Sequence, residues 1–75
     1  MQNIDKQNCN ILYVDDELNN LKAFQASFRR DYNVFTASNG DDGLKIFEEN
    51  DIQVIVTDQR MPGMTGVQFL QHLSD

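Results

Sequence analysis

The stretch that decides the fold is a short apolar run closed by acids, ILYVDDE at residues 11–17. An uninterrupted apolar run of four residues is typical of a strand buried on both faces, as in a parallel sheet. Because Asp15, Asp16 and Glu17 stop the run abruptly, we predict a strand over residues 11–14. Its carboxyl end therefore carries either a functional site or the cap of a following helix.

Helical and extended patterns alternate after this strand. Apolar residues recur at helical spacing from Leu18 to Phe28, and we expect Arg29 and Arg30 in the last turn, where the helix dipole favours cations. A β-branched and aromatic run then predicts a second strand over residues 33–37, followed by a turn. The first half of the chain thus reads as strand, helix, strand.

The second half repeats the alternation. Asp41 and Asp42 open a second helix, and a third β-branched run predicts a strand over residues 52–56. Thr65 and Gln68 stand at the spacing of a capping box and begin a third helix. Three strand–helix units in series indicate βαβ connections, hence an α/β fold with a parallel sheet and helices on both faces.

Length, charge and composition exclude several classes of protein. The chain has 75 residues, with 12 acidic against 6 basic side chains and a net charge of -6, which argues against direct nucleic-acid binding by this segment. No apolar run reaches the roughly 20 residues that span a bilayer, and the polar residues 1–10 read as a flexible leader without signal-peptide character. A single cysteine, Cys9, is typical of a reducing cytoplasm.

Acids end two of the predicted strands, because Asp58 follows the third strand as Asp15 and Asp16 follow the first. Carboxyl ends of parallel strands gather at one edge of a sheet, so these three acids converge if the two strands are neighbours. Clustered carboxylates repel one another unless a cation lies among them, and carboxylate oxygens suit Mg²⁺. Capping of the following helix is enough to explain Asp15 and Asp16, but the further acid Asp58 at the end of the third strand favours a metal site.

The runs VDDE at residues 14–17 and DQRMPGMTG at residues 58–66 carry a specific resemblance. Together they resemble the receiver domain of two-component response regulators, from Ile11 to the end of the chain. The resemblance implies a flavodoxin-like, doubly wound parallel sheet, which in a complete receiver has five strands in the order 2-1-3-4-5 and roughly 120 residues. Residues 11–75 would be the N-terminal part, a fold truncated to (βα)3 with strand order 2-1-3.

The same resemblance implies roles for single residues. Asp58 matches the phosphorylated aspartate, whose phosphoryl group comes from a histidine kinase or a phosphotransfer protein. Asp15 and Asp16 match the acid pair that holds Mg²⁺, Asp16 directly and Asp15 largely through water. The backbone carbonyl of Arg60 matches a further metal ligand. Such a domain is a signalling phosphoacceptor that promotes its own phosphorylation and dephosphorylation, and we do not expect an enzyme in the usual sense.

The chain also departs from a complete receiver. It lacks the hydroxyl residue after strand four and the lysine after strand five, so we expect the fragment alone to be phosphorylated poorly. Two alternatives stay open: a Mg²⁺-dependent phosphohydrolase with an aspartate nucleophile, and an interaction module that accepts no phosphate. Arg60 stands where such a hydrolase needs a second acid. An unpaired strand at residues 52–56 further predicts self-association.

Overall fold

The computed structural model describes residues 9–58 and 63–73 of the chain. Strands and helices alternate along it as predicted, in the order β1 (Asn10–Val14), α1 (Leu18–Phe28), β2 (Asn33–Ala37), α2 (Gly40–Glu49), β3 (Val54–Thr57) and α3 (Gly66–Leu73). The three strands form one parallel sheet in the order β2-β1-β3. The α/β class and the strand order 2-1-3 of a truncated flavodoxin-like fold are thereby confirmed.

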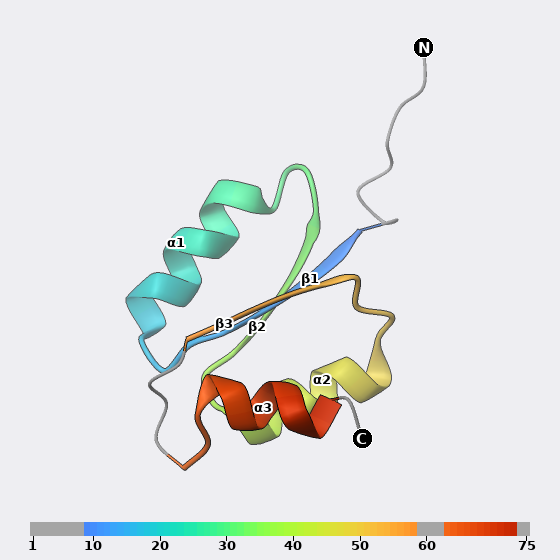
Figure 1. Cartoon of the computed structure of the whole chain (residues 1–75). Coiled ribbons are helices and arrows are strands. Elements are labelled where there is room, and N and C mark those ends of the chain that lie inside the picture. Colours follow the sequence, from blue (N-terminus) through green and yellow to red (C-terminus); the bar gives the residue numbers. More distant parts are fainter. Residues whose placement is uncertain (1–8, 59–62, 74–75) are drawn as a thin grey trace.

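The sheet is covered on both faces, as in a doubly wound fold. Figure 1 shows α1 on one side of the sheet and α2 with α3 on the other. β1 lies in the centre, where Leu12 is level with Phe35 of β2 and with Ile55 of β3. Because a central strand is covered from both sides, its apolar run has no polar interruption.

Side chains of β1 alternate between the two faces, and one face is closely packed. Leu12 and Val14 are fully buried and form a core cluster with Ala37 and Phe69 on the side of α2 and α3. A Cβ added at Gly43 would lie 2.9 Å from a ring carbon of Phe69, so glycine lets α2 approach α3. We call this side of the sheet the closed face.

Among the described residues, the opposite side of the sheet, which we call the open face, carries α1 alone. Ile11 and Tyr13 point to this side, because successive side chains of a strand alternate. The ring of Tyr13 packs on Phe24 with centroids 4.5 Å apart. An apolar groove of about 420 Å³ runs between α1 and β3. It is lined by Cys9, Ile11, Phe24, Phe28, Tyr32, Val54 and Val56.

Helix α1 covers the open face incompletely. The predicted apolar positions Leu18 and Phe28 are 60% and 39% exposed, whereas Leu21 is buried. The prediction that Arg29 and Arg30 form the last turn was wrong, since α1 ends at Phe28 and Arg29 is its C-cap. Helical spacing predicted the helix correctly, but fewer of its apolar positions are buried against the sheet than the spacing implied.

The third strand also differs from its prediction. It begins at Val54 rather than at residue 52, and it extends to Thr57. The side-chain oxygen of Gln53 accepts a hydrogen bond from the N–H of Asn10 at 2.7 Å, and the N–H of Gln53 donates to the carbonyl of Asn10 at 3.0 Å. Gln53 is therefore bonded to the start of β1 and precedes β3 instead of belonging to it.

Capping explains where α2 and α3 begin. The predicted capping box is confirmed, because the N–H of Thr65 donates to the side chain of Gln68 at 3.0 Å and the N–H of Gln68 donates to the Thr65 hydroxyl at 3.2 Å. For α2, the side chain of Asn39 accepts from the N–H of Asp42 at 2.8 Å. Gly40, which precedes the predicted start of this helix at Asp41, is its first residue.

The N-terminal end of the fold begins one residue earlier than the predicted strand. Asn10 is the first residue of β1, and its side chain donates to the carbonyl of Asp51 at 2.8 Å. Residues 1–8, most of the predicted leader, lie outside the described residues. Within the described ranges, no helix has the length and hydropathy that a bilayer span requires.

Candidate functional site

Backbone hydrogen bonds bring the ends of β1 and β3 together. The N–H of Asp58 donates to the carbonyl of Val14 at 2.9 Å, and the N–H of Asp15 donates to the carbonyl of Ala37 at 3.1 Å. The ladder of the sheet thus continues one residue beyond each strand. Asp15 and Asp58 are consequently fixed side by side at the same edge of the sheet.

Three carboxylates gather at this edge. Asp15, Asp16 and Asp58 each offer an oxygen, and these oxygens lie within 4.8 Å of one another. Asp15 is 2% exposed, Asp58 is half-buried and Asp16 is exposed. The convergence predicted from the two strand ends is therefore present, in a site that is closed at Asp15 and open to solvent at Asp16.

Asp15 is held by three donors from its own chain. Its Oδ2 accepts from the hydroxyl of Tyr13 at 2.6 Å and from the side-chain amide of Asn20 at 3.0 Å. Its Oδ1 accepts from the N–H of Glu17 at 3.0 Å. Burial raises the pKa of Asp15 and is the largest single influence. The hydrogen bonds, that of Tyr13 first, together outweigh it and lower the pKa below its usual value.

Tyr13 contacts the acidic cluster, which the sequence alone did not indicate. It was treated only as one apolar member of the first strand, yet its hydroxyl contacts the most buried acid of the site. The hydrogen bond to Asp15, then burial and the negative charges of Asp15 and Asp58, raise the pKa of Tyr13 to about 12. Its spacing two residues before an acid, on the same face of a strand, could have indicated the contact.

The donor set fits a hard divalent cation. All three groups offer carboxylate oxygens, which Mg²⁺ prefers over nitrogen or sulfur. Two oxygens on opposite sides of one Mg²⁺ lie about 4.2 Å apart, from bond lengths near 2.1 Å. The spread of the three acids is thus close to that of a single coordination shell. Three unneutralised carboxylates at this distance repel one another, which a cation relieves.

The structure describes His72 but not Arg60. Arg60, the predicted carbonyl ligand, lies outside the described residues. His72 is exposed in the last turn of α3.

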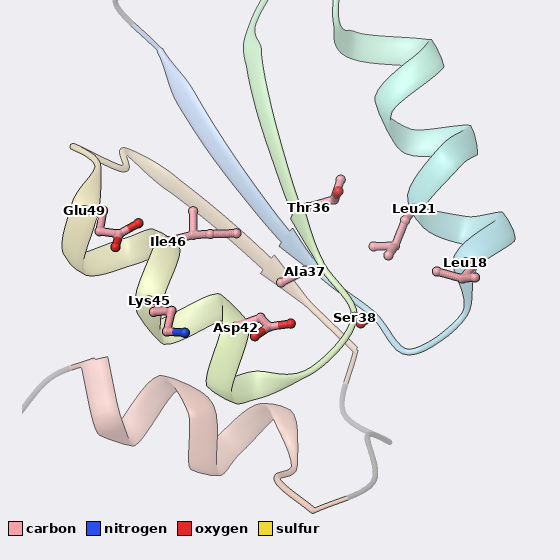
Figure 2. A pocket seen from close by; sticks show the side chains of 9 residues that line it. All are labelled: Leu18, Leu21, Thr36, Ala37, Ser38, Asp42, Lys45, Ile46 and Glu49. Atoms are coloured by element: carbon pink, nitrogen blue, oxygen red, sulfur yellow. The ribbon is translucent and has the colours of Figure 1, made fainter.

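A separate hollow of about 400 Å³ lies at the outer edge of β2. Figure 2 shows Leu18 and Leu21 of α1 on one side of it and Lys45 and Ile46 of α2 on the other, with Thr36 of β2 between them. Its other lining residues are Ala37, Ser38, Asp42 and Glu49. The lining mixes both signs of charge with apolar carbon and includes none of the three clustered acids, so it does not extend the acidic site.

Known proteins are similar to this chain over most of its length. The family described as response regulator receiver domain matches residues 11–75. This chain belongs to the receiver-domain family of response regulators. The receiver is 37% identical over 71 residues to the hydrogenase transcriptional regulatory protein HoxA of Cupriavidus necator, covering 95% of this chain and 14% of HoxA. It is 32% identical over 76 residues to the chemotaxis protein CheY-3 of Vibrio cholerae, covering 97% of this chain and 58% of CheY-3.

Solved structures show the same fold. A response regulator receiver domain from Clostridium thermocellum superimposes with a TM-score of 0.82 and 36% sequence identity, covering 88% of this chain and 55% of that one. The receiver described here thus spans a little over half the length of CheY-3 and of that crystal structure.

Proposed function

We propose that this receiver accepts a phosphoryl group on Asp58, with Mg²⁺ held by Asp15, Asp16, Asp58 and the backbone carbonyl of Arg60. The observation that carries the proposal is the convergence of three carboxylates at the carboxyl ends of β1 and β3. Family membership over residues 11–75 supports it independently. Asp58 is the acceptor because it is half-buried and therefore accessible, whereas Asp15 is buried and its Oδ2 already accepts two protein hydrogen bonds.

The phosphoryl donor in this proposal is the phosphohistidine of a kinase or phosphotransfer protein, acting in the cytoplasm. The P–N bond of the donor breaks while a P–O bond to a carboxylate oxygen of Asp58 forms, and the imidazole takes up a proton. Asp58 needs alignment rather than activation, since its carboxylate is already the nucleophile. Its N–H bond to Val14 supplies part of that alignment. Bound Mg²⁺ would neutralise charge on the transferring phosphoryl oxygens.

The direct test is intact-mass measurement of the intact native protein after incubation with Mg²⁺ and acetyl phosphate. We expect one phosphoryl adduct, which disappears in Asp58→Asn and persists in Asp41→Asn, an exposed acid on α2 outside the cluster. An adduct that survives Asp58→Asn would refute the site assignment. Steady release of phosphate from a phosphate ester, without a requirement for a phosphohistidine or acyl phosphate donor, would favour the phosphohydrolase instead.

We further propose that the chain of residues 1–75 self-associates through β3. Within the described ranges β3 pairs with β1 on one side only, and its Val54 and Val56 are exposed beside the apolar groove of the open face. An unpaired strand edge offers backbone donors and acceptors to another strand, and a second copy presents the same edge.

A further inference from the structure

We propose that Tyr13 and Asn20 are positioning residues of the metal site, which act by fixing the orientation of Asp15. The inference rests on the proposed function and adds two residues to the site that binds Mg²⁺. It starts from the hydrogen bonds of one carboxylate, that of Asp15.

Counting lone pairs shows how much of Asp15 is left for a cation. A carboxylate oxygen has two lone pairs, and Oδ2 of Asp15 accepts two hydrogen bonds, from Tyr13 and from Asn20. Among the described residues, Oδ1 accepts one hydrogen bond, from the N–H of Glu17, and keeps one lone pair. Asp15 can therefore approach a cation, or a water bound to it, only through Oδ1 and only as a single-point ligand.

The two side-chain donors are themselves held in place. Tyr13 follows the alternation of β1 onto the same face as Asp15, and its ring packs on Phe24 at 4.5 Å between centroids. Phe24 packs in turn on Phe28 at 4.7 Å. Asn20 lies in the first turn of α1. Its N–H donates to the carbonyl of Glu17 at 3.0 Å, which fixes its backbone. Strand and helix thus fix the carboxylate from two directions.

A fixed carboxylate lowers the cost of assembling the site. An acid on an unrestrained side chain would lose rotamer freedom when a cation binds, whereas Asp15 has already lost it on folding. Partners that orient ligands in this way typically change metal affinity by about 10- to 100-fold when they are removed. Tyr13→Phe removes the hydroxyl and keeps the ring on Phe24, so packing is retained.

The test is Mn²⁺ affinity of the intact native protein, measured by electron paramagnetic resonance without any phosphoryl donor. We expect Tyr13→Phe and Asn20→Ala each to weaken Mn²⁺ binding by about tenfold or more. The matched controls are Tyr32→Phe, beyond the C-terminal end of α1, and Asn19→Ala, exposed beside Asn20, and both should bind as the wild type does.

A second measurement separates positioning from a purely structural role. In Tyr13→Phe the Mg²⁺ concentration that half-saturates phosphorylation should rise, while the rate at saturating Mg²⁺ stays unchanged. Loss of the saturated rate, or Mn²⁺ binding as tight as or tighter than wild type in both variants, would overturn the inference. A wild type that binds Mn²⁺ while Asp58→Asn still forms the adduct would refute the phosphorylation site alone. A wild type without Mn²⁺ binding would refute the metal site and this inference together.

Discussion

On the closed face Leu12, Val14 and Phe69 have no exposed surface, whereas on the open face Val54 and Val56 of the same sheet remain 42% and 37% exposed. The same three strands present apolar side chains on both faces, so the difference in exposure depends on what covers each face. Two helices cover one face and a single helix covers the other (Figure 1). The comparison teaches that stability is concentrated on the closed face. The buried acid Asp15 and its donors lie on the side of α1.

The largest effect should come from truncating the centre of the closed face. Phe69→Ala should lower the free energy of unfolding by about 3–5 kcal/mol, because it leaves a cavity against Leu12 and Val14. This is a large part of the stability of a small domain. Urea titration followed by circular dichroism measures it. The control is Leu70→Ala, the next residue of α3, which is 45% exposed and should cost less than about 1 kcal/mol. Equal losses would contradict the comparison.

On the side of α1, stability should fall at alkaline pH. Because the pKa of Tyr13 is raised to about 12 in the folded protein, its protonated form is favoured by folding. Tyr13 therefore contributes fully to the free energy of unfolding below its unfolded pKa near 10, and this contribution is lost as pH rises through the folded pKa. After solvent screening it amounts to at most about 2 kcal/mol.

The measurement for Tyr13 is unfolding between neutral and alkaline pH, together with the absorbance of the tyrosinate. Tyr13→Phe should remove the alkaline loss of stability that this residue causes. Asp15→Asn should shift the ionisation of Tyr13 to lower pH, because both the hydrogen bond and the nearby charge of Asp15 raise the pKa of Tyr13. An unchanged ionisation in Asp15→Asn would contradict the contact.

A smaller effect is expected from overfilling the closed face. In Gly43→Ala the new Cβ would lie 2.9 Å from a ring carbon of Phe69 and 3.0 Å from Val14. Overpacking costs about 1–3 kcal/mol, and the helix propensity of alanine returns up to about 1 kcal/mol. We expect a net loss near 1 kcal/mol in thermal unfolding, against no loss in Glu48→Ala on the exposed side of α2. A stabilised Gly43→Ala would show that the two helices can separate freely.

The smallest effect on the stability of one chain should come from a charge on the open face. Val56→Lys should change the free energy of unfolding by less than about 0.5 kcal/mol, yet abolish self-association of the chain of residues 1–75, because lysine on an edge strand prevents pairing. Sedimentation velocity measures the association. Leu70→Lys, exposed on α3, is the control and should leave it intact. A wild type that stays a compact monomer at high concentration would refute the proposal.

Much of the fold could be predicted from local patterns. The second strand has the predicted bounds, Asn33–Ala37, and the capping box of Thr65 and Gln68 forms as expected. Each depends on neighbours in sequence, since periodicity and capping are short-range. The start of β3 was mispredicted because the apolar run includes Ile52, whereas the hydrogen bonds of Gln53 with Asn10 set the boundary. That partner lies 43 residues away in the chain.

The candidate site, like the fold, could be predicted only in part from the sequence. The residues themselves identified the acids as strand-end groups, but their convergence was conditional on which strands are neighbours, and only the resemblance to receivers supplied the order 2-1-3. The structure places β3 beside β1 and brings Asp58 to Asp15. Tyr13 was overlooked because its role depends on a side-chain hydroxyl within an apolar run, which hydropathy counts as part of the core.

The sequence by itself determined the alternation of strands and helices, the bounds of β2, the capping box at the start of α3, and the acids that follow the first and third strands. Only the tertiary structure decided that two helices close one face while α1 leaves the other open, and that Asp15 is held from two directions. The physical reason is the distance along the chain over which each kind of interaction acts. Backbone propensity and capping act over a few residues, whereas burial and hydrogen bonding join whichever surfaces the fold brings together.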